Sequence, residues 1–384
     1  MSAPQALETV VQHYAWGSRT LIPAILGLPA PAPDPWAELW VGTHPGGPSV
    51  LPDGRSLAEI EPDLPYLLKL LSAVEPLSLQ AHPDAEQAAA GYAREEAAGV
   101  PFAAAHRTYK DPHAKPEMLV ALTPFSALCG FRDPADALRL TRALDCPALD
   151  PLAAALEQDD PEVALRDAFT LGMTVPAEGR TALVVAAAAA AAGHAADPGT
   201  DPRDARAYAW VARLALLHLG DVSALAPLLL QTVTLEPGEG LALPPRTLHA
   251  YLAGGAIEVM GSSDNVLRGG LTPKHVDVDA LLGVVDFHAR PIPWVHPRAL
   301  GPGVEVYDSG SEAFRLLHAQ STGGAVPVPS SGPRLVLVTS GLLDVRTSDG
   351  SLLVRPGHAA YVSAAAGPLT LLGDGAAWVA EPGG

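Results

Sequence analysis

Gln80 and His82 are separated by one residue and directly follow a short apolar run, Leu77-Ser78-Leu79. On a β-strand, side chains two positions apart point to the same face, so this carboxamide and this imidazole can reach one ion together. Both groups are ligands that divalent metal ions accept. The pair therefore indicates a metal-binding strand end, beside the simpler interpretation of a turn residue and a hydrogen-bonded core histidine.

Two more candidate ligands lie far along the chain. Glu117 follows Lys115-Pro116 and leads into the apolar run Met118–Leu122, which can place its carboxylate at the start of a strand. His249 ends the segment Gly238–His249, in which a glycine, five residues, a proline and a turn precede the histidine, a spacing that resembles the second metal motif of cupins. Taken singly, each of these residues is more typical of a loop or a core.

Together, two imidazoles, one carboxylate and one carboxamide suit Zn²⁺ or a similar divalent ion. Because only Glu117 is anionic, the complex keeps about one unit of positive charge, which helps it stabilise an oxyanion. A cupin oxygenase using Fe²⁺ is one rival, but such sites often carry a His-x-His pair, and here Gln80 replaces its first histidine. A non-catalytic metal-binding cupin is another rival.

Three regions of the chain that differ in composition must position these residues. Residues 1 to about 125 are rich in Pro and Gly, with strand-like runs at Pro65–Leu71 and Leu77–Gln80. From Asp133 to about residue 219 the chain is helical in composition, and Asp133-Pro134 and Asp160-Pro161 predict helix N-termini. Strand-like runs return from residue 223, and residues 295–384 have turns of their own, including Ser340-Gly341. We therefore expect a helical insertion between two β regions and a second, C-terminal barrel.

Composition narrows the range of partners. The chain of 384 residues has 24 basic and 42 acidic side chains, a formal net charge of −18, which argues against nucleic acid and anionic membranes. A small phosphorylated ligand remains compatible, because one pocket needs only two or three cations. The two cysteines do not suggest a disulfide framework, and the Ala-rich stretch 181–196 is interpreted as a helix outside any membrane. We expect a cytoplasmic protein.

The candidate ligands lie within longer motifs: Tyr14-Ala-Trp-Gly17, Ala37–Pro45, Leu77–Asp84, Lys115-Pro-Glu-Met118 and Glu258–Lys274. In this order the motifs resemble those of type I mannose-6-phosphate isomerase (phosphomannose isomerase), a family of the cupin superfamily. The resemblance is dense over residues 1–132 and 225–290. It thins in the helical block and is only architectural in the C-terminal region.

This resemblance implies a mainly β double cupin, two jelly-roll barrels with an inserted α-helical domain. It divides the chain into a catalytic cupin at 1–132 and 223–292, a helical insertion at 133–222 and a C-terminal cupin-like barrel at 293–384. The implied activity is the zinc-dependent interconversion of mannose 6-phosphate and fructose 6-phosphate through an enediol, with one Zn²⁺ per chain. We expect the protein to be a monomer. The implied zinc ligands are Gln80, His82, Glu117 and His249. The implied catalytic residues are Arg268, Glu258 and Lys115, and the implied substrate-binding residues are Ser78, Lys69, Lys274, Asp264 and Tyr251.

Two positions depart from the family pattern. The family usually has a histidine immediately before Lys-Pro-Glu, where this chain has Ala114, with His113 one place earlier. The glycine expected in the turn before His249 is Arg246, which predicts a left-handed residue with a Cβ at a cost of about 1 kcal/mol. The proton-transfer base stays open between Glu258, Lys115 and a histidine, and His44 is interpreted as a structural residue at the barrel mouth.

Overall fold

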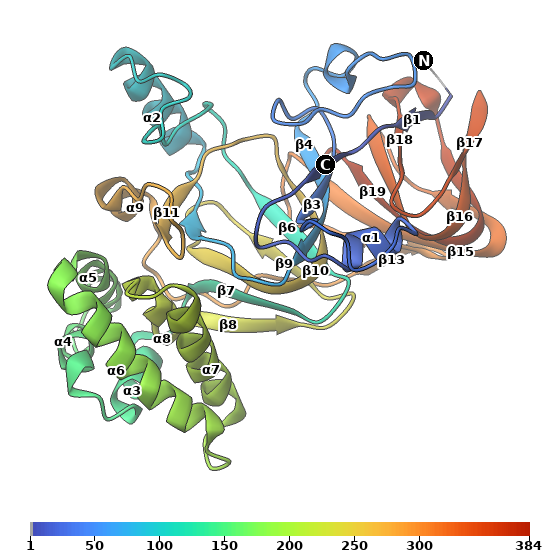
Figure 1. Cartoon of the computed structure of the whole chain (residues 1–384). Helices are drawn as coiled ribbons and strands as arrows, with labels where there is room; N and C mark the ends of the chain where they lie inside the picture. Colours follow the sequence, from blue (N-terminus) through green and yellow to red (C-terminus); the bar gives the residue numbers. More distant parts are fainter. Residues whose placement is uncertain (1–2) are drawn as a thin grey trace.

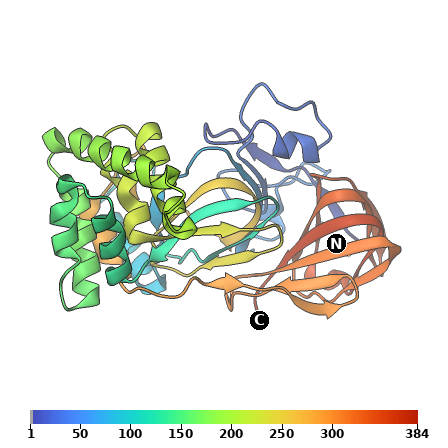
Figure 2. The ribbon, with the colours of Figure 1, turned by 90° about the horizontal axis from the view of Figure 1, so that it is seen from below.

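The computed structural model describes residues 3–384, and the strands among them form two antiparallel sheets. The first sheet contains β2 (Val10–Gln12), β3 (Glu38–Val41), β4 (Tyr66–Ala73), β5 (Leu79–Ala81), β6 (Glu117–Ala121), β7 (Phe125–Phe131), β8 (Leu230–Leu235), β9 (Gly240–Leu243), β10 (His249–Gly261), β11 (Leu267–Gly270) and β12 (Trp294–Val295). The second contains β1 (Gln5–Leu7), β13 (Arg298–Gly301), β14 (Val304–Tyr307), β15 (Arg315–Val328), β16 (Arg334–Thr347), β17 (Gly350–Val354), β18 (Ala359–Val362) and β19 (Leu369–Glu381). The first sheet lies between the block of helices within residues 134–229 and the second sheet (Figures 1 and 2).

Strand β10 is the centre of the first sheet. Its second half pairs with β4 on one side and β6 on the other, and its first half pairs with β5 and β7. The register sets Glu258 opposite Lys69 of β4, and it sets His249 opposite Gln80 of β5. One long strand therefore brings candidate residues from three separate motifs into one barrel.

The two faces of β4, β6 and β10 are both buried. Leu71, Leu119 and Ala256 face the interior of the first barrel. The alternate side chains pack with Leu335, Leu337 and Trp378 of the second sheet, and the Tyr66 hydroxyl donates a hydrogen bond to the Ala380 carbonyl (3.0 Å). Burial on both sides explains why β4 is buried along its whole length and almost continuously apolar instead of alternating.

The helical block is an insertion between β7 and β8. It contains α3 (Pro134–Ala143), α4 (Asp150–Ala155), α5 (Pro161–Thr174), α6 (Ala177–Ala196), α7 (Pro202–Leu217) and α8 (Ala226–Leu229), while α1 (Leu21–Ile25), α2 (Ala85–Ala97) and α9 (Val278–Val284) lie outside it. Asp133 and Asp160 cap α3 and α5, each with Pro at the first helical turn, so both predicted helix starts are confirmed.

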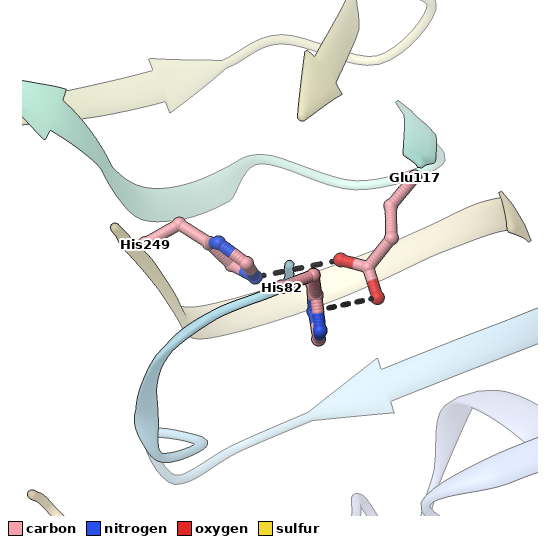
Figure 3. Close-up of side chains that lie close together, drawn as sticks. All are labelled: His82, Glu117 and His249. Atoms are coloured by element: carbon pink, nitrogen blue, oxygen red, sulfur yellow. Dashed lines mark ion pairs between the residues drawn. The ribbon is translucent and has the colours of Figure 1, made fainter. Parts of the chain in front are cut away.

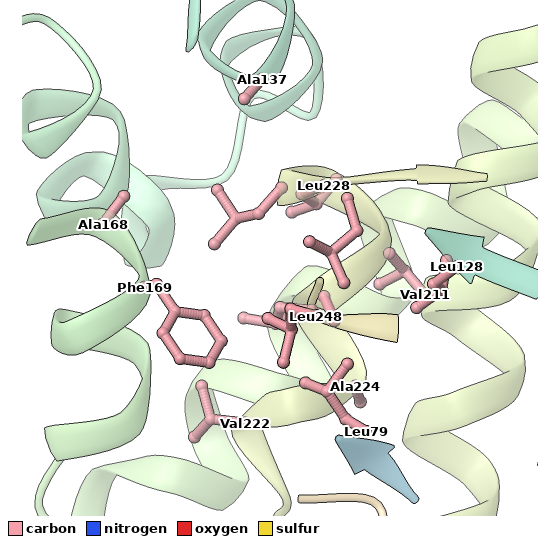
Figure 4. Close-up of a cluster of buried hydrophobic side chains, with 14 of the residues drawn as sticks. Leu79, Leu128, Ala137, Ala168, Phe169, Val211, Val222, Ala224, Leu228 and Leu248 are labelled. Atoms are coloured by element: carbon pink, nitrogen blue, oxygen red, sulfur yellow. The ribbon is translucent and has the colours of Figure 1, made fainter. Parts of the chain in front are cut away.

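The helical block packs directly behind the strands that carry candidate ligands. Its apolar core, drawn in Figure 4, includes Leu79 of β5, Leu128 of β7 and Leu248, the residue before β10. Each of these three side chains is fully buried. The helices therefore supply a rigid backing for β5 and for the start of β10.

The expected mainly β chain with two sheets and a helical insertion is confirmed. Strand β1, from the N-terminal stretch assigned above to the catalytic cupin, pairs with β18 in the second sheet. The turn expected at Ser340-Gly341 is wrong, because β16 continues through it. Gly341 (φ 71°) lies next to a register shift between β16 and β19, where a Cβ would overlap the Asp374 carbonyl.

Among residues 3–384, no single helix has both the length and the hydropathy that a membrane crossing needs. The adjoining helices α5 and α6 meet these requirements only as a pair, with a bend of 114° between them.

Candidate metal centre

Three predicted ligands meet inside the first barrel, as Figure 3 shows. His249 is the first residue of β10, His82 follows β5 and Glu117 is the first residue of β6. The Nε2 atom of His82 is 3.2 Å from Glu117 Oε1, and the Nε2 atom of His249 is 3.4 Å from Glu117 Oε2. All three side chains are buried, and their potential ligand atoms lie within 4.8 Å of one another.

The fourth predicted ligand, Gln80, borders this cluster. Its amide nitrogen lies 3.4 Å from His249 Nε2, and its Oε1 accepts a hydrogen bond from the Ser78 hydroxyl (3.1 Å). Oxygen and nitrogen of a carboxamide exchange places on a half-turn about the last side-chain bond. That rotation directs the Gln80 oxygen toward the imidazole nitrogens, while Ser78 can still accept a hydrogen bond from the amide.

The backbone fixes which histidine nitrogens face the cluster. His82 Nδ1 lies 2.6 Å from the Asn265 carbonyl oxygen, and His249 Nδ1 lies 2.9 Å from that of Thr247. A carbonyl oxygen only accepts, so each Nδ1 carries the proton and each Nε2 presents a lone pair. This is the arrangement of metal-binding histidines.

Buried lone pairs then face one another without a proton between them. Among residues 3–384, His82 Nε2 and Glu117 Oε2 are buried atoms with no hydrogen-bond partner. Such unsatisfied groups are costly unless something else neutralises them. Two imidazole nitrogens and a carboxylate within reach of one point fit a divalent cation such as zinc.

The charges around the cluster keep the ligands in their metal-binding protonation states. Burial, reinforced by the Lys115 cation, lowers the pKa of His82 to about 4. Burial alone would raise the pKa of Glu117, but the Lys115 cation, whose Nζ lies 2.9 Å from Glu117 Oε1, outweighs it and holds this pKa well below its usual range. At neutral pH His82 is therefore neutral and Glu117 ionised.

A second charged group lies on the same face of the sheet. Lys69 Nζ is 3.1 Å from Glu258 Oε2 and 3.5 Å from Glu38 Oε1, and the Trp40 indole donates a hydrogen bond to Glu38 (2.8 Å). Burial raises the pKa of Glu258 although Lys69 opposes the shift. For Lys69, burial favours the neutral form, but the carboxylates of Glu258 and Glu38 outweigh it and raise its pKa.

Two cations without acidic partners come from β11 and from the residues that follow it. Arg268 of β11 is opposite Gln80 in the sheet register. The charge of Arg268 contributes, after burial, to lowering the pKa of Lys274, so the two cations are close enough to interact. Across residues 3–384, the structure contains no ion pair of either side chain with a carboxylate, which leaves both charges free for an anionic ligand.

Comparison with known proteins identifies the family. The model of the type I phosphomannose isomerase catalytic domain matches residues 5–63 and 53–134. Mannose-6-phosphate isomerase of Escherichia coli K12 is 32% identical over 97% of both chains, and that of Bos taurus is 30% identical over 93% of both. The chain belongs to the type I phosphomannose isomerase family.

Solved structures of this family agree with the fold along the whole chain. The crystal structure of the Salmonella typhimurium mannose 6-phosphate isomerase bound to substrate and zinc has a TM-score of 0.88, 31% identity and 99% coverage of both chains. The apo form of that enzyme has a TM-score of 0.89 with full coverage of both chains. The expected membership of the isomerase family is confirmed.

Of the two remaining family positions, Tyr251 lies in the barrel interior and Asp264 lies at the surface. Tyr251 is buried beside His249 (ring centroids 6.0 Å apart), and burial, with the carboxylates of Glu258 and Glu117, raises its pKa well above the usual value. The phenol therefore stays protonated and can donate a hydrogen bond. Asp264 lies at the surface, where its Oδ1 is 3.1 Å from His44 Nε2.

Two contacts were not predicted from the sequence. Glu38 balances Lys69, and His44, interpreted as structural, holds Asp264. Both residues belong to the quoted motif Ala37–Pro45. A single glutamate at the start of the otherwise apolar run Glu38–Val41 was the available signal, because a buried carboxylate needs a cationic partner.

The two departures from the family pattern have clear structural settings. Arg246 adopts φ 70° as predicted, and it is anchored there, because its N–H donates to the His82 carbonyl (2.6 Å) and its Nε donates to the Val284 carbonyl (3.0 Å). The His113 side chain is exposed, and its backbone carbonyl accepts hydrogen bonds from Asn265 and Ser263.

Proposed function

We propose that this protein is a zinc-dependent isomerase that interconverts mannose 6-phosphate and fructose 6-phosphate. The observation that supports this proposal best is the buried His82–Glu117–His249 cluster in a chain that belongs to the phosphomannose isomerase family. Gln80 would complete the zinc site with its carboxamide oxygen. When bound there, zinc supplies a Lewis acid that stabilises negative charge on the sugar oxygens.

In this proposal the phosphate lies between Arg268 and Lys274. Two cations with no carboxylate partner are suited to a dianionic phosphate, and arginine adds a planar pair of donors. Lys69 suits the phosphate less well, because Glu258 and Glu38 already balance its charge. Ser78 would hold the orientation of Gln80, and Asp264 would bind sugar hydroxyls at the entrance.

Proton transfer is assigned to Glu258. Isomerisation removes a proton from the carbon beside the carbonyl and returns it to the neighbouring carbon through an enediol. Because burial raises its pKa, this carboxylate is a stronger base than an exposed glutamate and can hold the proton between the two steps. Lys69 would steady the Glu258 carboxylate, Lys115 would stabilise the enediolate oxygen, and the Arg268 guanidinium would be shared between that oxygen and the phosphate.

The chain supplies every one of these residues itself, so we further propose a monomeric enzyme. Cys129 and Cys146 are both free thiols, which fits a reducing compartment such as the cytoplasm.

The test is the His249→Ala variant with a matched histidine control. The parent protein should convert mannose 6-phosphate into fructose 6-phosphate and lose this activity on chelation, whereas His249→Ala should lose zinc and turnover together. His318→Ala, in the second barrel beside Trp378, should retain both. Normal turnover by zinc-free protein would refute the proposal, and equal turnover of unphosphorylated mannose would refute the phosphate assignment.

A further inference from the structure

The turn Ser263–Asn265 joins the end of β10 to β11 and is hydrogen-bonded to a segment that is distant in the sequence. Asn265 is fully buried, although asparagine is a residue that is mostly found exposed. Its side chain is hydrogen-bonded to residues 110–113. These residues end the long connection that contains α2 and runs from His82 to Lys115. A buried polar side chain at this crossing must satisfy its hydrogen bonds within the protein.

The Asn265 carboxamide uses all of its hydrogen-bonding groups on that segment. Its Oδ1 accepts from the backbone N–H groups of Lys110 (2.7 Å) and Asp111 (3.3 Å). Its Nδ2 donates to the backbone carbonyls of Asp111 (2.7 Å) and His113 (2.9 Å). Exchanging the two amide atoms would oppose donors to donors and acceptors to acceptors, so the orientation is unambiguous.

The same turn makes three further contacts. The Asp264 N–H donates to the Asp111 carboxylate (2.9 Å), and the Ser263 hydroxyl donates to the His113 carbonyl (3.2 Å). On its other side, the Asn265 carbonyl accepts the Nδ1 proton of His82 (2.6 Å). One residue thus contacts a metal ligand through its backbone and the segment leading to Lys115 and Glu117 through its side chain.

We infer that Asn265 is a positioning residue that sets the orientation of His82 and the place of the Lys110–His113 segment at the same time. This inference rests on the proposed function, because it assigns His82 and Glu117 to zinc. Residues 110–113 form no strand. The hydrogen bonds of the Asn265 amide therefore hold this segment in place where sheet pairing does not. Loss of the amide frees the segment and lets the turn, with the carbonyl that orients His82, move away.

The inference predicts a specific loss of zinc affinity. Groups that orient a metal ligand typically change the affinity 10- to 100-fold when they are removed. A residue that only packs the turn would lower stability and leave the ligand geometry of the folded protein unchanged. Zinc affinity and local hydrogen exchange therefore separate the two roles, and neither measurement requires isomerase turnover.

The experiment compares Asn265→Ala with Gln231→Ala. The Gln231 amide also donates to backbone carbonyls, those of Phe131 (3.2 Å), Arg290 (2.9 Å) and Cys129 (3.4 Å), none of which belongs to a candidate metal ligand. Zinc affinity is measured by competition with a chromophoric chelator, and exchange of the Lys110 and Asp111 amides is measured in zinc-free protein. We expect Asn265→Ala to weaken zinc binding 10- to 100-fold and to accelerate exchange at both amides, and Gln231→Ala to do neither.

A second variant keeps the test decisive if Asn265→Ala does not fold. Asn265→Asp retains the oxygen that accepts from Lys110 and Asp111 but loses the two N–H donors of the amide. It should therefore release the His113 end of the Lys110–His113 segment and still weaken zinc binding. Parent-like zinc affinity in either folded variant would overturn the inference, as would an equal loss in Gln231→Ala. A parent protein that binds zinc without isomerising mannose 6-phosphate would refute the proposed function alone, and a parent that does not bind zinc would refute both.

Discussion

Replacing Lys69 with methionine removes one charge from the barrel interior while nearly preserving the length of the side chain. The parent residue is about 7% exposed, and its ammonium group contacts two carboxylates, those of Glu258 at 3.1 Å and Glu38 at 3.5 Å. At an effective dielectric constant of about 20, unit charges separated by 3.1 Å attract by about 5 kcal/mol. Relief from burying the ammonium offsets part of this, so we expect Lys69→Met to lower the free energy of unfolding by about 3–5 kcal/mol at pH 7.

The loss should depend on pH, with a definite sign. The pKa of Glu258 is raised in the folded protein, so the folded state binds more protons than the unfolded state just above the ordinary pKa. Stability therefore falls as pH rises from the unfolded pKa through the folded one. Removing Lys69 takes away the charge that most lowers the pKa of Glu258. The pH range over which stability falls therefore extends to higher pH in the variant. The difference between parent and variant is then smaller at pH 5 than at pH 7.

Urea denaturation at both pH values, followed by tryptophan fluorescence in the presence of a chelator, measures this difference without the contribution of zinc binding. The double variant Lys69→Met/Glu258→Gln should regain part of the lost stability, because one unpaired carboxylate is gone. Arg55→Met, which breaks the exposed pair with Asp53, is the matched control and should show no such pH dependence. A loss below about 1 kcal/mol for Lys69→Met at pH 7, or an equal loss at both pH values, would refute the reasoning.

Three other changes test separate parts of the structure. Arg268→Ala should keep zinc but lower kcat/KM about 10- to 100-fold, since a hydrogen bond to a charged group is worth about 1.5–3 kcal/mol; a coupled assay checks this, and an unchanged kcat/KM contradicts the role. Gly91→Ala should lower the free energy of unfolding by about 1–3 kcal/mol, because its Cβ would overlap the ring of the buried Tyr109; urea denaturation that shows parent stability would contradict this packing. Asp160→Ala should cost about 1 kcal/mol by removing the cap that accepts from the Glu162 and Val163 N–H groups, and a thermal melt of the variant equal to that of the parent would be the contrary result.

Features with local causes could be predicted from the sequence. Asp133 and Asp160 cap helices because an aspartate followed by proline satisfies the first turn without any distant contact. Strand β4, Tyr66–Ala73, largely coincides with the apolar run Pro65–Leu71 that predicts it. The left-handed backbone of Arg246 followed from its place in the turn before His249.

Features that depend on sheet register could not be predicted in this way. Whether Glu38 faces Lys69 or solvent depends on the pairing of β3 with β4, and the contact of His44 with Asp264 joins residues 220 positions apart in the sequence. The pairing of β1 with β18 joins the two ends of the chain and has no signal in a three-residue strand. Sequence patterns fix the face that a residue occupies within its strand but leave open the strand that lies opposite.

The curvature of β10 is what joins the metal cluster to the candidate base. Its first residue, His249, contacts Glu117 through its side chain, and Met260, near the other end, is paired with Glu117 in the sheet. A straight strand of this length would hold the two positions ~36 Å apart at about 3.3 Å per residue. The strand must therefore curl around the barrel, and Gly254 (φ 130°), next to a register shift, permits the bend.

The register of the second half of β10 then decides the chemistry. Glu258 faces the barrel interior, and its neighbour Ile257 faces the second sheet. A slip of one residue would bury the carboxylate among Leu335 and Trp378 and put an isoleucine beside Lys69. Because both faces are buried, such a slip is costly everywhere along the strand. The packing between the two barrels thus enforces the orientation of the proposed base, although the second barrel contributes none of the residues assigned to the site.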